Sequence, residues 1–206
     1  MPSLPPHHDP VTTASADARA ALRRTLRAAR RALTPAERLA RSDRALSQLI
    51  RLPAVARARC LGVYLPLASE VDTWPLIDWA LNRGVTVAVP VVLRGGMHCH
   101  ALQAPLLETA LGTVQPSGAP RIPRNRIDAL IMPLLGFDDD GQRLGMGGGY
   151  YDRYLQPARC RRLPRPLRIG LAFSCQHLST LPAAPWDIRL HAAVTEHGVQ
   201  RFAQDV

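Results

Sequence analysis

Residues 143–152 bring phosphate-binding groups and a potential metal ligand together in one short segment. They read Arg-Leu-Gly-Met-Gly-Gly-Gly-Tyr-Tyr-Asp, so glycine occupies four of the five positions 145–149. Glycine adopts backbone conformations closed to other residues and lets the main chain approach a ligand closely. Arg143 can neutralise phosphate charge, and Asp152 offers the carboxylate oxygens that Mg²⁺ accepts beside phosphate. The alternative role for Asp152 is to cap the helix expected from Tyr150.

The position of this segment in the chain also favours an anion site. The helix expected from Tyr150 would place the glycines at its N-terminus, where free N–H groups attract anions. An apolar run over 128–135 ends just before the segment, and ligands of open α/β sheets bind beyond the carboxyl ends of strands. The familiar nucleotide motifs are absent, because G-x-x-x-x-G-K-[ST] needs a lysine and Tyr150 stands where G-x-G-x-x-G needs glycine. All 26 basic residues are arginine, so phosphate must be held by Arg, backbone amides or a metal.

The elements that must position this segment begin with a pair of helices. Residues 17–33 are rich in Ala, Leu and Arg, which are strong helix formers. Thr34, Pro35 and Glu37 then form a helix start, with Thr34 as the cap, Pro35 at the first helical position and Glu37 closing a capping box. We expect this second helix to run to about Arg51, just before Pro53.

The rest of the chain has the pattern of an α/β protein. Short apolar runs at 60–65, 85–92, 128–135, 167–173 and 191–195 predict buried strands, with a helix over 75–82, an edge strand over 97–103 and a surface loop over 112–125. Continuous apolar strands separated by helices argue for a mostly parallel sheet covered by helices on both faces. We expect residues 1–16 to form a disordered lead and residues 17–206 a single domain, which is an ordinary domain size.

Composition limits the setting in which the chain works. The formal net charge is +10, which we interpret as a solvated Arg-rich surface. The sequence has no apolar stretch of about 20 residues, the length that spans a bilayer, and residues 1–16 lack the apolar core of a signal peptide. We therefore expect a cytoplasmic protein. His98, Cys99 and His100 are not interpreted as a metal site, because a strand would point Cys99 away from the two histidines.

Four segments, in order, resemble the 5-formyltetrahydrofolate cyclo-ligases, also called 5,10-methenyltetrahydrofolate synthetases. The longest is 137–152, which is similar to the family's glycine-rich motif. Residues 19–23 resemble its basic ATP-contacting motif, residues 64–73 its folate-contacting strand and loop, and residues 186–190 its closing segment. The resemblance extends over about residues 17–196, and it implies an open α/β fold like the NagB/RpiA/CoA-transferase-like fold.

The resemblance also implies roles for individual residues. It implies ATP contacts by Arg19, Ala20, Ala21, Leu22, Arg23, Arg143, Leu144, Gly145, Met146, Gly147, Gly148, Gly149, Tyr150 and Tyr151. It implies folate contacts by Leu65, Glu70, Met146, Gly147, Gly148, Gly149 and Tyr150, and Mg²⁺ ligation by Asp152 and Asp187. Many members carry Arg where Met146 stands and Lys where Gly148 stands, so backbone donors and Arg153 would have to replace two cations.

The family's reaction uses Mg-ATP to close a ring on a formylated folate. ATP would phosphorylate the N5-formyl oxygen, N10 would attack the activated carbon, and phosphate would leave. Such chemistry depends on positioning and charge stabilisation. The partners implied are therefore two small molecules, 5-formyltetrahydrofolate and ATP, with no membrane or nucleic acid, and we expect a monomer. Trp74, Trp79 and Trp186 are interpreted as core or rim residues rather than as platforms for a base.

Two other functions compete with this interpretation. A sugar-phosphate isomerase or an acyl-CoA transferase on a similar scaffold would need a catalytic carboxylate at a strand end, and Glu70 is the candidate. An Arg-rich nucleic-acid-binding module would use the basic helices and would lose affinity steeply with salt. That module leaves residues 145–152 without a role and offers no aromatic ladder for stacking bases. The cyclo-ligase therefore ranks first.

Overall fold

A computed structural model of the chain describes residues 10–93, 96–109, 114–156 and 166–203, and the side chains of residues 10–15 are not described. It opens with helices α1 (Pro10–Ala32) and α2 (Pro35–Leu49), the expected helical pair. Helix α1 begins at Pro10, within the expected lead over residues 1–16. Residues 1–9 of that lead lie outside the described residues. The division into a lead and a domain over 17–206 stays a prediction.

The predicted start of α2 is confirmed in detail. Thr34 Oγ1 accepts a hydrogen bond from the Glu37 amide at 3.2 Å, and a Glu37 carboxylate oxygen accepts one from the Thr34 amide at 2.8 Å. Pro35 occupies the first helical turn, where its missing N–H costs nothing. The helix ends at Leu49, and a short helix α3 (Pro53–Ala56) follows.

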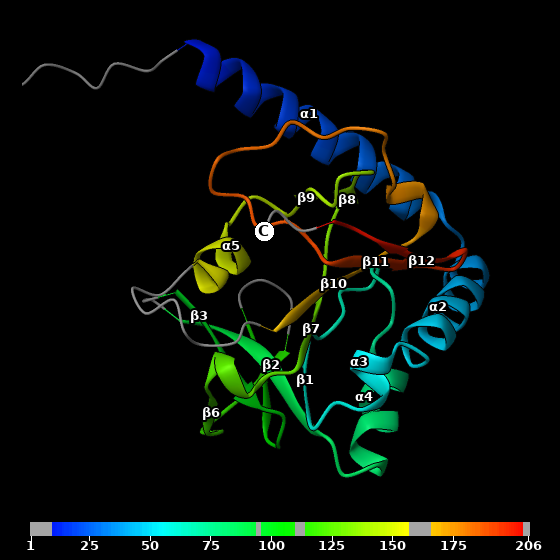
Figure 1. Cartoon of the computed structure of the whole chain (residues 1–206), viewed down its shortest axis with the longest axis vertical. Helices are drawn as coiled ribbons and strands as arrows, with labels where there is room; N and C mark the ends of the chain where they lie inside the picture. Colours follow the sequence, from blue (N-terminus) through cyan, green and yellow to red (C-terminus); the bar gives the residue numbers. More distant parts are fainter. Residues whose placement is uncertain (1–9, 94–95, 110–113, 157–165, 204–206) are drawn as a thin grey trace, which may run out of the picture.

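The centre of the molecule is one mixed but mostly parallel sheet (Figure 1). Its parallel strands are β1 (Cys60–Val63), β2 (Thr86–Leu93), β7 (Ala129–Met132), β10 (Leu167–Leu171) and β11 (Ala192–Thr195). Antiparallel strands extend both edges, namely β12 (Gly198–Arg201) beside β11, then β3 (Gly96–Ala101) beside β2 and β6 (Arg121–Ile122) beside β3. The order β12-β11-β10-β7-β1-β2-β3-β6 confirms the predicted parallel core.

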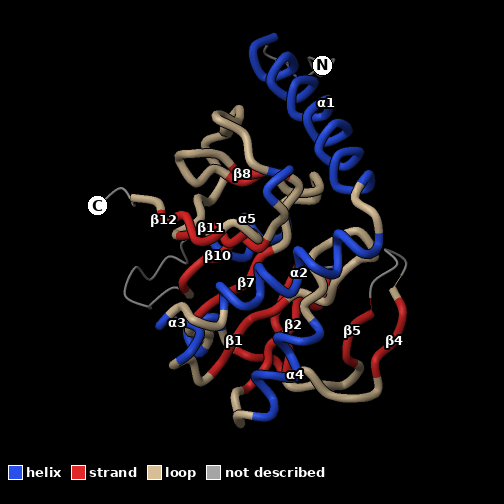
Figure 2. Tube along the Cα trace, turned by 90° about the vertical axis from the view of Figure 1, so that its right-hand side faces the viewer, coloured by secondary structure: helices blue, strands red, loops and turns tan. Residues whose placement is uncertain are grey.

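Helices cover both faces of this sheet, as expected. On one face, Leu49 of α2, Val55 of α3 and Ile77 of α4 (Trp74–Asn82) share a buried apolar cluster with alternate strand residues. On the other face, Leu155 of α5 (Tyr150–Leu155) packs with Cys99 and the remaining strand side chains. Figures 1 and 2 show α5 on the opposite side of the sheet from α2 and α4. None of the described helices is long and apolar enough to cross a membrane.

Two local expectations need correction. Strand β3 is not the edge of the sheet, because β6 pairs with it. The region expected as a surface loop contains β5 (Val114–Pro116), which pairs with β4 (Leu106–Glu108), as well as β6 and the 3₁₀ turn η1 (Arg124–Arg126). Strands of two or three residues carry too short a pattern to stand out among Pro and Gly. Cys99 is buried in the α5-side core, and no cluster of three metal-binding side chains occurs in the described chain.

Candidate functional site

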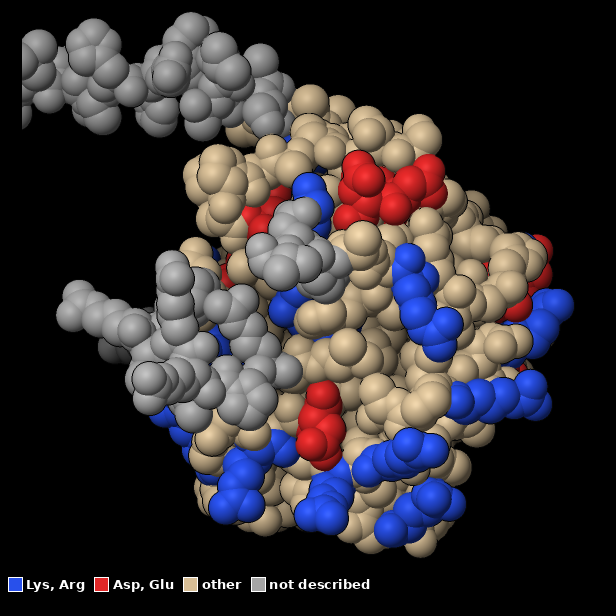
Figure 3. Space-filling model, in the orientation of Figure 1, with Lys and Arg blue, Asp and Glu red and all other residues tan. Residues whose placement is uncertain are grey.

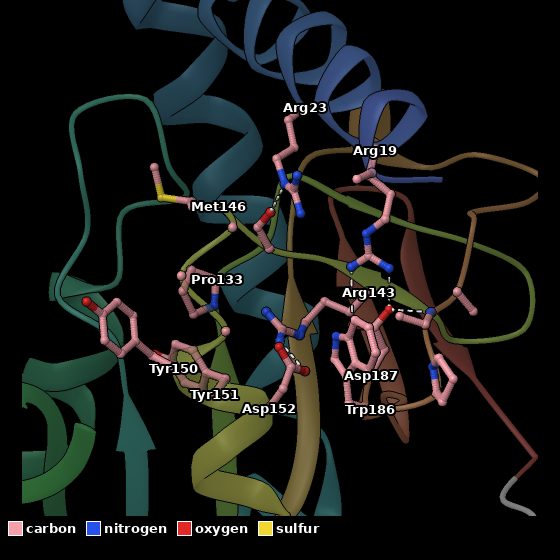
Figure 4. Close-up of a pocket in the computed structure, with 18 residues that line it drawn as sticks. Arg19, Arg23, Pro133, Arg143, Met146, Tyr150, Tyr151, Asp152, Trp186 and Asp187 are labelled. Carbon is pink, nitrogen blue, oxygen red and sulfur yellow. Dashed lines mark hydrogen bonds and ion pairs between the residues drawn. The ribbon is translucent and has the colours of Figure 1, made fainter. Parts of the chain in front are cut away.

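A pocket of about 600 Å³ opens beside the glycine-rich segment (Figure 4). It lies between α1, the segment that follows β7, the glycine-rich turn and the loop over 183–187. Its lining consists of Ala16, Arg19, Arg23, Pro133, Arg143, Gly145, Met146, Gly147, Gly148, Gly149, Tyr150, Tyr151, Asp152, Ala183, Ala184, Pro185, Trp186 and Asp187. The volume suits one ligand of drug-like size. The pocket thus gathers three of the four segments singled out in the sequence, namely 19–23, 137–152 and 186–190.

The glycine-rich turn lines this pocket with residues whose backbone amides are largely unpaired within the described chain. A short ribbon of β8 (Gly136–Phe137) and β9 (Arg143–Leu144) leads into the turn. Gly147 and Gly149 have φ values of 109° and 61°, a region that glycine enters without steric cost. The amides of residues 146–149 donate no hydrogen bond within the described residues. Helix α5 spans only six residues, so these amides, rather than a long helix dipole, are the feature that could hold an anion.

Arg143 and Asp152 form the floor of the site. Arg143 is buried, its Nη2 lies 2.9 Å from Asp152 Oδ1, and its guanidinium lies over the Tyr151 ring at 5.6 Å. Burial raises the pKa of Tyr151, which keeps its hydroxyl neutral. Asp152 Oδ1 also accepts from the Ile188 amide at 3.3 Å, whereas Oδ2 has no hydrogen bond from any described residue. Asp152 therefore keeps one carboxylate oxygen for a cation, and it fits the single-carboxylate ligation that Mg²⁺ accepts beside phosphates and water.

Asp187 is in a different state. Both of its oxygens are engaged by Arg19, with Nη1 paired to Oδ2 and Nη2 at 3.2 Å from Oδ1. Oδ2 also accepts from the Ala184 amide at 2.8 Å. Two oxygens that already serve an arginine and an amide do not fit a metal ion unless Arg19 moves away. The structure therefore supports the predicted place of Asp187 in the pocket but not a free ligand there.

Arg23 supplies a cation directly beside the glycine turn. Its Nε donates to the Gly145 carbonyl at 3.0 Å, and a Cβ built on Gly147 would lie 3.7 Å from its guanidinium carbon. Burial, with the charge of Arg19 second, lowers the pKa of Arg23. Arg153 also approaches the turn, because a Cβ at Gly149 would lie 2.8 Å from its Nη1. Both arginines thus lie near the glycine turn, but Arg153, expected as a replacement cation, is not part of the pocket lining.

Several expected contacts fall outside the pocket. Ala20, Ala21 and Leu22 lie between the two arginines on α1 but do not line it, and neither does Leu144. Leu22 packs instead against the buried cluster that contains Leu144. A helix turns 100° per residue, so Arg19 and Arg23 share a face that the three residues between them do not.

The two residues expected at the pterin are also outside the pocket lining. Leu65 is buried, and Glu70 is buried with one oxygen 3.4 Å from Arg30 Nη1 and the other accepting from the Leu67 amide at 3.0 Å. Burial raises the pKa of Glu70 against these stabilising partners. Glu70 is therefore a buried, paired carboxylate rather than a solvated one.

Sequence reasoning missed Pro133 and residues 183–185 as pocket walls. Trp186, interpreted as a core or rim residue, is 57% exposed and lines the pocket. A tryptophan adjoining a candidate site residue, Asp187, was the signal available for it.

Known proteins match this chain over most of its length. A model of the 5-formyltetrahydrofolate cyclo-ligase family matches residues 15–196. The 5-formyltetrahydrofolate cyclo-ligase of Escherichia coli K12 is 38% identical over 178 residues, covering 82% of this chain and 96% of that protein. The NMR structure of Aquifex aeolicus 5,10-methenyltetrahydrofolate synthetase is similar with a TM-score of 0.79 at 30% identity, over 91% of this chain and 94% of that one.

A second solved structure agrees. The 5,10-methenyltetrahydrofolate synthetase of Mycoplasma pneumoniae is similar with a TM-score of 0.69 at 26% identity, over 86% of this chain and 98% of that one. The family model spans every residue that lines the pocket. This chain belongs to the 5-formyltetrahydrofolate cyclo-ligase family.

Proposed function

We propose that this protein converts 5-formyltetrahydrofolate to 5,10-methenyltetrahydrofolate with Mg-ATP, releasing ADP and phosphate. One observation carries the proposal. Arg19, Arg23 and Arg143 line the same pocket as the open amides of the glycine turn and the carboxylate of Asp152. Such a set of donors and one acid suits a triphosphate with its metal. The names of the relatives in this family supply the folate half of the reaction.

The chemistry requires activation of a poor leaving group. The γ-phosphate of ATP is transferred to the N5-formyl oxygen, N10 attacks the activated carbon, and the C–O bond to phosphate breaks as the ring closes. The side chains have two tasks in this scheme, to hold the phosphates in line with the formyl oxygen and to neutralise their charge. We propose Arg23 and the amides of the glycine turn for both tasks, which their position at the pocket and the unpaired amides support. We propose Arg143 as the buried charge behind them.

Asp152 is the residue we propose to hold Mg²⁺, because one of its oxygens remains available. The metal, when bound, neutralises phosphate charge and fixes the geometry of the triphosphate. The ligand role implied for Asp187 stays a prediction, and it would require Arg19 to leave the carboxylate.

We propose that the folate enters at the Met146–Tyr150 end of the pocket. Contacts to Leu65 and Glu70, which lie outside the present lining, would then require the site to extend past Tyr151. Location in the cytoplasm and a monomeric state stay predictions.

The structure offers no specific support for the two competing functions. Glu70, the carboxylate that an isomerase or transferase would need, is buried against Arg30 and does not line the pocket. Basic side chains spread over the lower part of the face in Figure 3 with an acidic group among them, which matches a solvated surface.

The decisive test is turnover. Purified protein mixed with 5-formyltetrahydrofolate and Mg-ATP should give a rising absorbance from the methenyl product, together with ADP. Omitting ATP or adding a chelator should stop the rise. Product formation at the same rate without ATP would refute the proposal, and so would the absence of any product with both substrates present.

A further inference from the structure

Trp186 exposes a large aromatic surface inside the pocket. Trp186 is 57% exposed, although tryptophan is usually mostly buried in proteins. Figure 4 shows the ring beside Asp187 and Arg143, at one end of the cavity. Ala183, Ala184 and Pro185 form the wall next to it. An exposed aromatic face bounded by small residues suits a flat ligand group, because such a group can stack on the ring and stay wet at its edges.

The loop that carries Trp186 is held in place by its own polar groups. The Pro182 carbonyl accepts from Arg19 at 3.0 Å, the Ala184 amide donates to Asp187 at 2.8 Å, and the Asp187 amide donates to the Ala184 carbonyl at 2.9 Å. Pro185 has no N–H to offer. The loop is therefore fixed, and much of its hydrogen-bonding capacity is already used before a ligand arrives.

The layout of the pocket decides which end of a nucleotide lies at Trp186. Met146 and Tyr150 stand at the other side of the cavity in Figure 4, with Arg23 and Arg143 between them and Trp186, while Arg19 lies above the Trp186 ring. The proposed reaction needs the γ-phosphate at the Met146–Tyr150 end, where the folate meets it. The phosphates then follow the arginines, and the unreactive end of the molecule reaches the indole.

We infer that Trp186 is the platform on which the nucleobase of the triphosphate stacks, and that the base is recognised by stacking rather than by hydrogen bonds. This inference rests on the proposed function, and it goes further by naming the base-binding residue and the specificity. Every base has a π-face, so stacking is tolerant of base identity. Purine and pyrimidine nucleoside triphosphates should therefore all bind, purines better by several-fold because they cover more of the ring.

The experiment separates base binding from phosphate binding. Equilibrium binding of ATP, GTP, CTP and inorganic tripolyphosphate, each with Mg²⁺, is measured by calorimetry on the wild type, Trp186→Ala, Trp186→Phe and Trp74→Ala. Trp74 is the matched control, because it is 38% exposed on α4 and does not line the pocket. Trp186→Ala should lower the affinity for ATP by about tenfold and leave the affinity for tripolyphosphate unchanged. Phe should restore most of the loss, and Trp74→Ala should bind all four ligands as the wild type does.

Three results would overturn the inference. If Trp186→Ala binds ATP with the affinity of the wild type, Trp186 is not the surface on which the base stacks. A loss of tripolyphosphate equal to the loss of ATP shows that Trp186 only supports the phosphate site. GTP or CTP bound more than about a hundredfold more weakly than ATP to the wild type shows hydrogen-bond readout of the base. Failure of the wild type to bind either ATP or tripolyphosphate would instead refute the nucleotide site of the proposed function, and the platform with it.

Discussion

Two aspartates that look equivalent in the sequence differ in the site. Asp152 pairs with Arg143 through one oxygen and keeps the other available, whereas both oxygens of Asp187 are engaged by Arg19. A carboxylate that already accepts several charge-assisted hydrogen bonds gains little by exchanging them for a metal. Removing the carboxylate of Asp152 should therefore weaken Mg²⁺ binding more than removing the carboxylate of Asp187.

Asp152→Asn should reduce turnover by at least about tenfold and raise the Mg²⁺ concentration needed for half-maximal rate, because the amide is a weak metal ligand. The fold should survive, since the amide oxygen can still accept from Arg143 at the observed 2.9 Å geometry. The measurements are kcat as a function of Mg²⁺ and Mn²⁺ binding to the protein–nucleotide complex.

The control for this variant is Asp140→Asn, which changes an exposed acid in the same stretch of chain, outside the pocket lining. It should keep wild-type turnover and metal dependence. Unchanged Mn²⁺ binding in Asp152→Asn would remove Asp152 from the metal site.

Helices α1 and α2 differ in which parts of the molecule their side chains contact. Helix α1 carries the pocket arginines and Arg30, which reaches Glu70 and the Leu134 carbonyl, both at 3.4 Å. Helix α2 buries Leu46 and Leu49 against the sheet and begins at the Thr34 cap. Helix α1 therefore serves both the site and the core, where its Leu26 is buried, whereas a change at the α2 cap alters no pocket residue.

Thr34→Ala should lower the free energy of unfolding by about 1 kcal/mol, because the Glu37 amide loses its acceptor. Urea unfolding followed by circular dichroism measures this change. Ser47→Ala, at an exposed position in the last turn of the same helix and far from the Thr34 cap, should alter stability by less than about 0.5 kcal/mol. Equal losses of unfolding free energy in the two variants would show that the Thr34 cap does not stabilise the helix more than an ordinary surface residue does. Turnover at 25 °C should stay unchanged in both variants.

The pocket is a property of the whole molecule, since Arg19 and Asp187 are separated by 168 positions in the chain.

The stability of the whole fold also depends on pH through His191. Its Nδ1 accepts from the Arg168 amide at 2.9 Å, and burial, followed by the charge of Arg168, lowers its pKa to about 4. The folded state thus prefers the neutral ring, while the unfolded chain binds a proton near the ordinary pKa of about 6.5.

Because the folded pKa lies below the unfolded one, the contribution of His191 is complete above pH 6.5 and is lost as the pH falls toward 4. After discounting for the half-exposed ring, the loss by pH 5 should be about 1 kcal/mol. His191→Asn keeps an acceptor for the Arg168 amide but does not titrate. Urea unfolding at pH 7.5 and pH 5 should show a smaller drop in the variant than in the wild type, and identical drops would contradict the assignment.

Local patterns in the sequence determined the local structure. The apolar runs at 60–65, 85–92, 128–135 and 167–173 became parallel strands β1, β2, β7 and β10, because a continuous apolar run needs burial on both faces. The Thr34 cap and the helix after residue 149 were predictable for the same reason, since each depends on residues within one turn of the chain. The residues of the glycine-rich turn also stood out by their own composition, and the family resemblance added Arg19, Arg23 and Asp187.

Only the tertiary structure decided which side chains meet. It paired Asp187 with Arg19, buried Glu70 against Arg30 and opened the face of Trp186 to the pocket. It also added β6 beyond β3, through residues too few to show a period. Neighbouring residues fix a backbone conformation, but a contact between distant residues depends on the order of the strands and on the packing between them. Those are settled jointly by the whole chain, and no single segment encodes them.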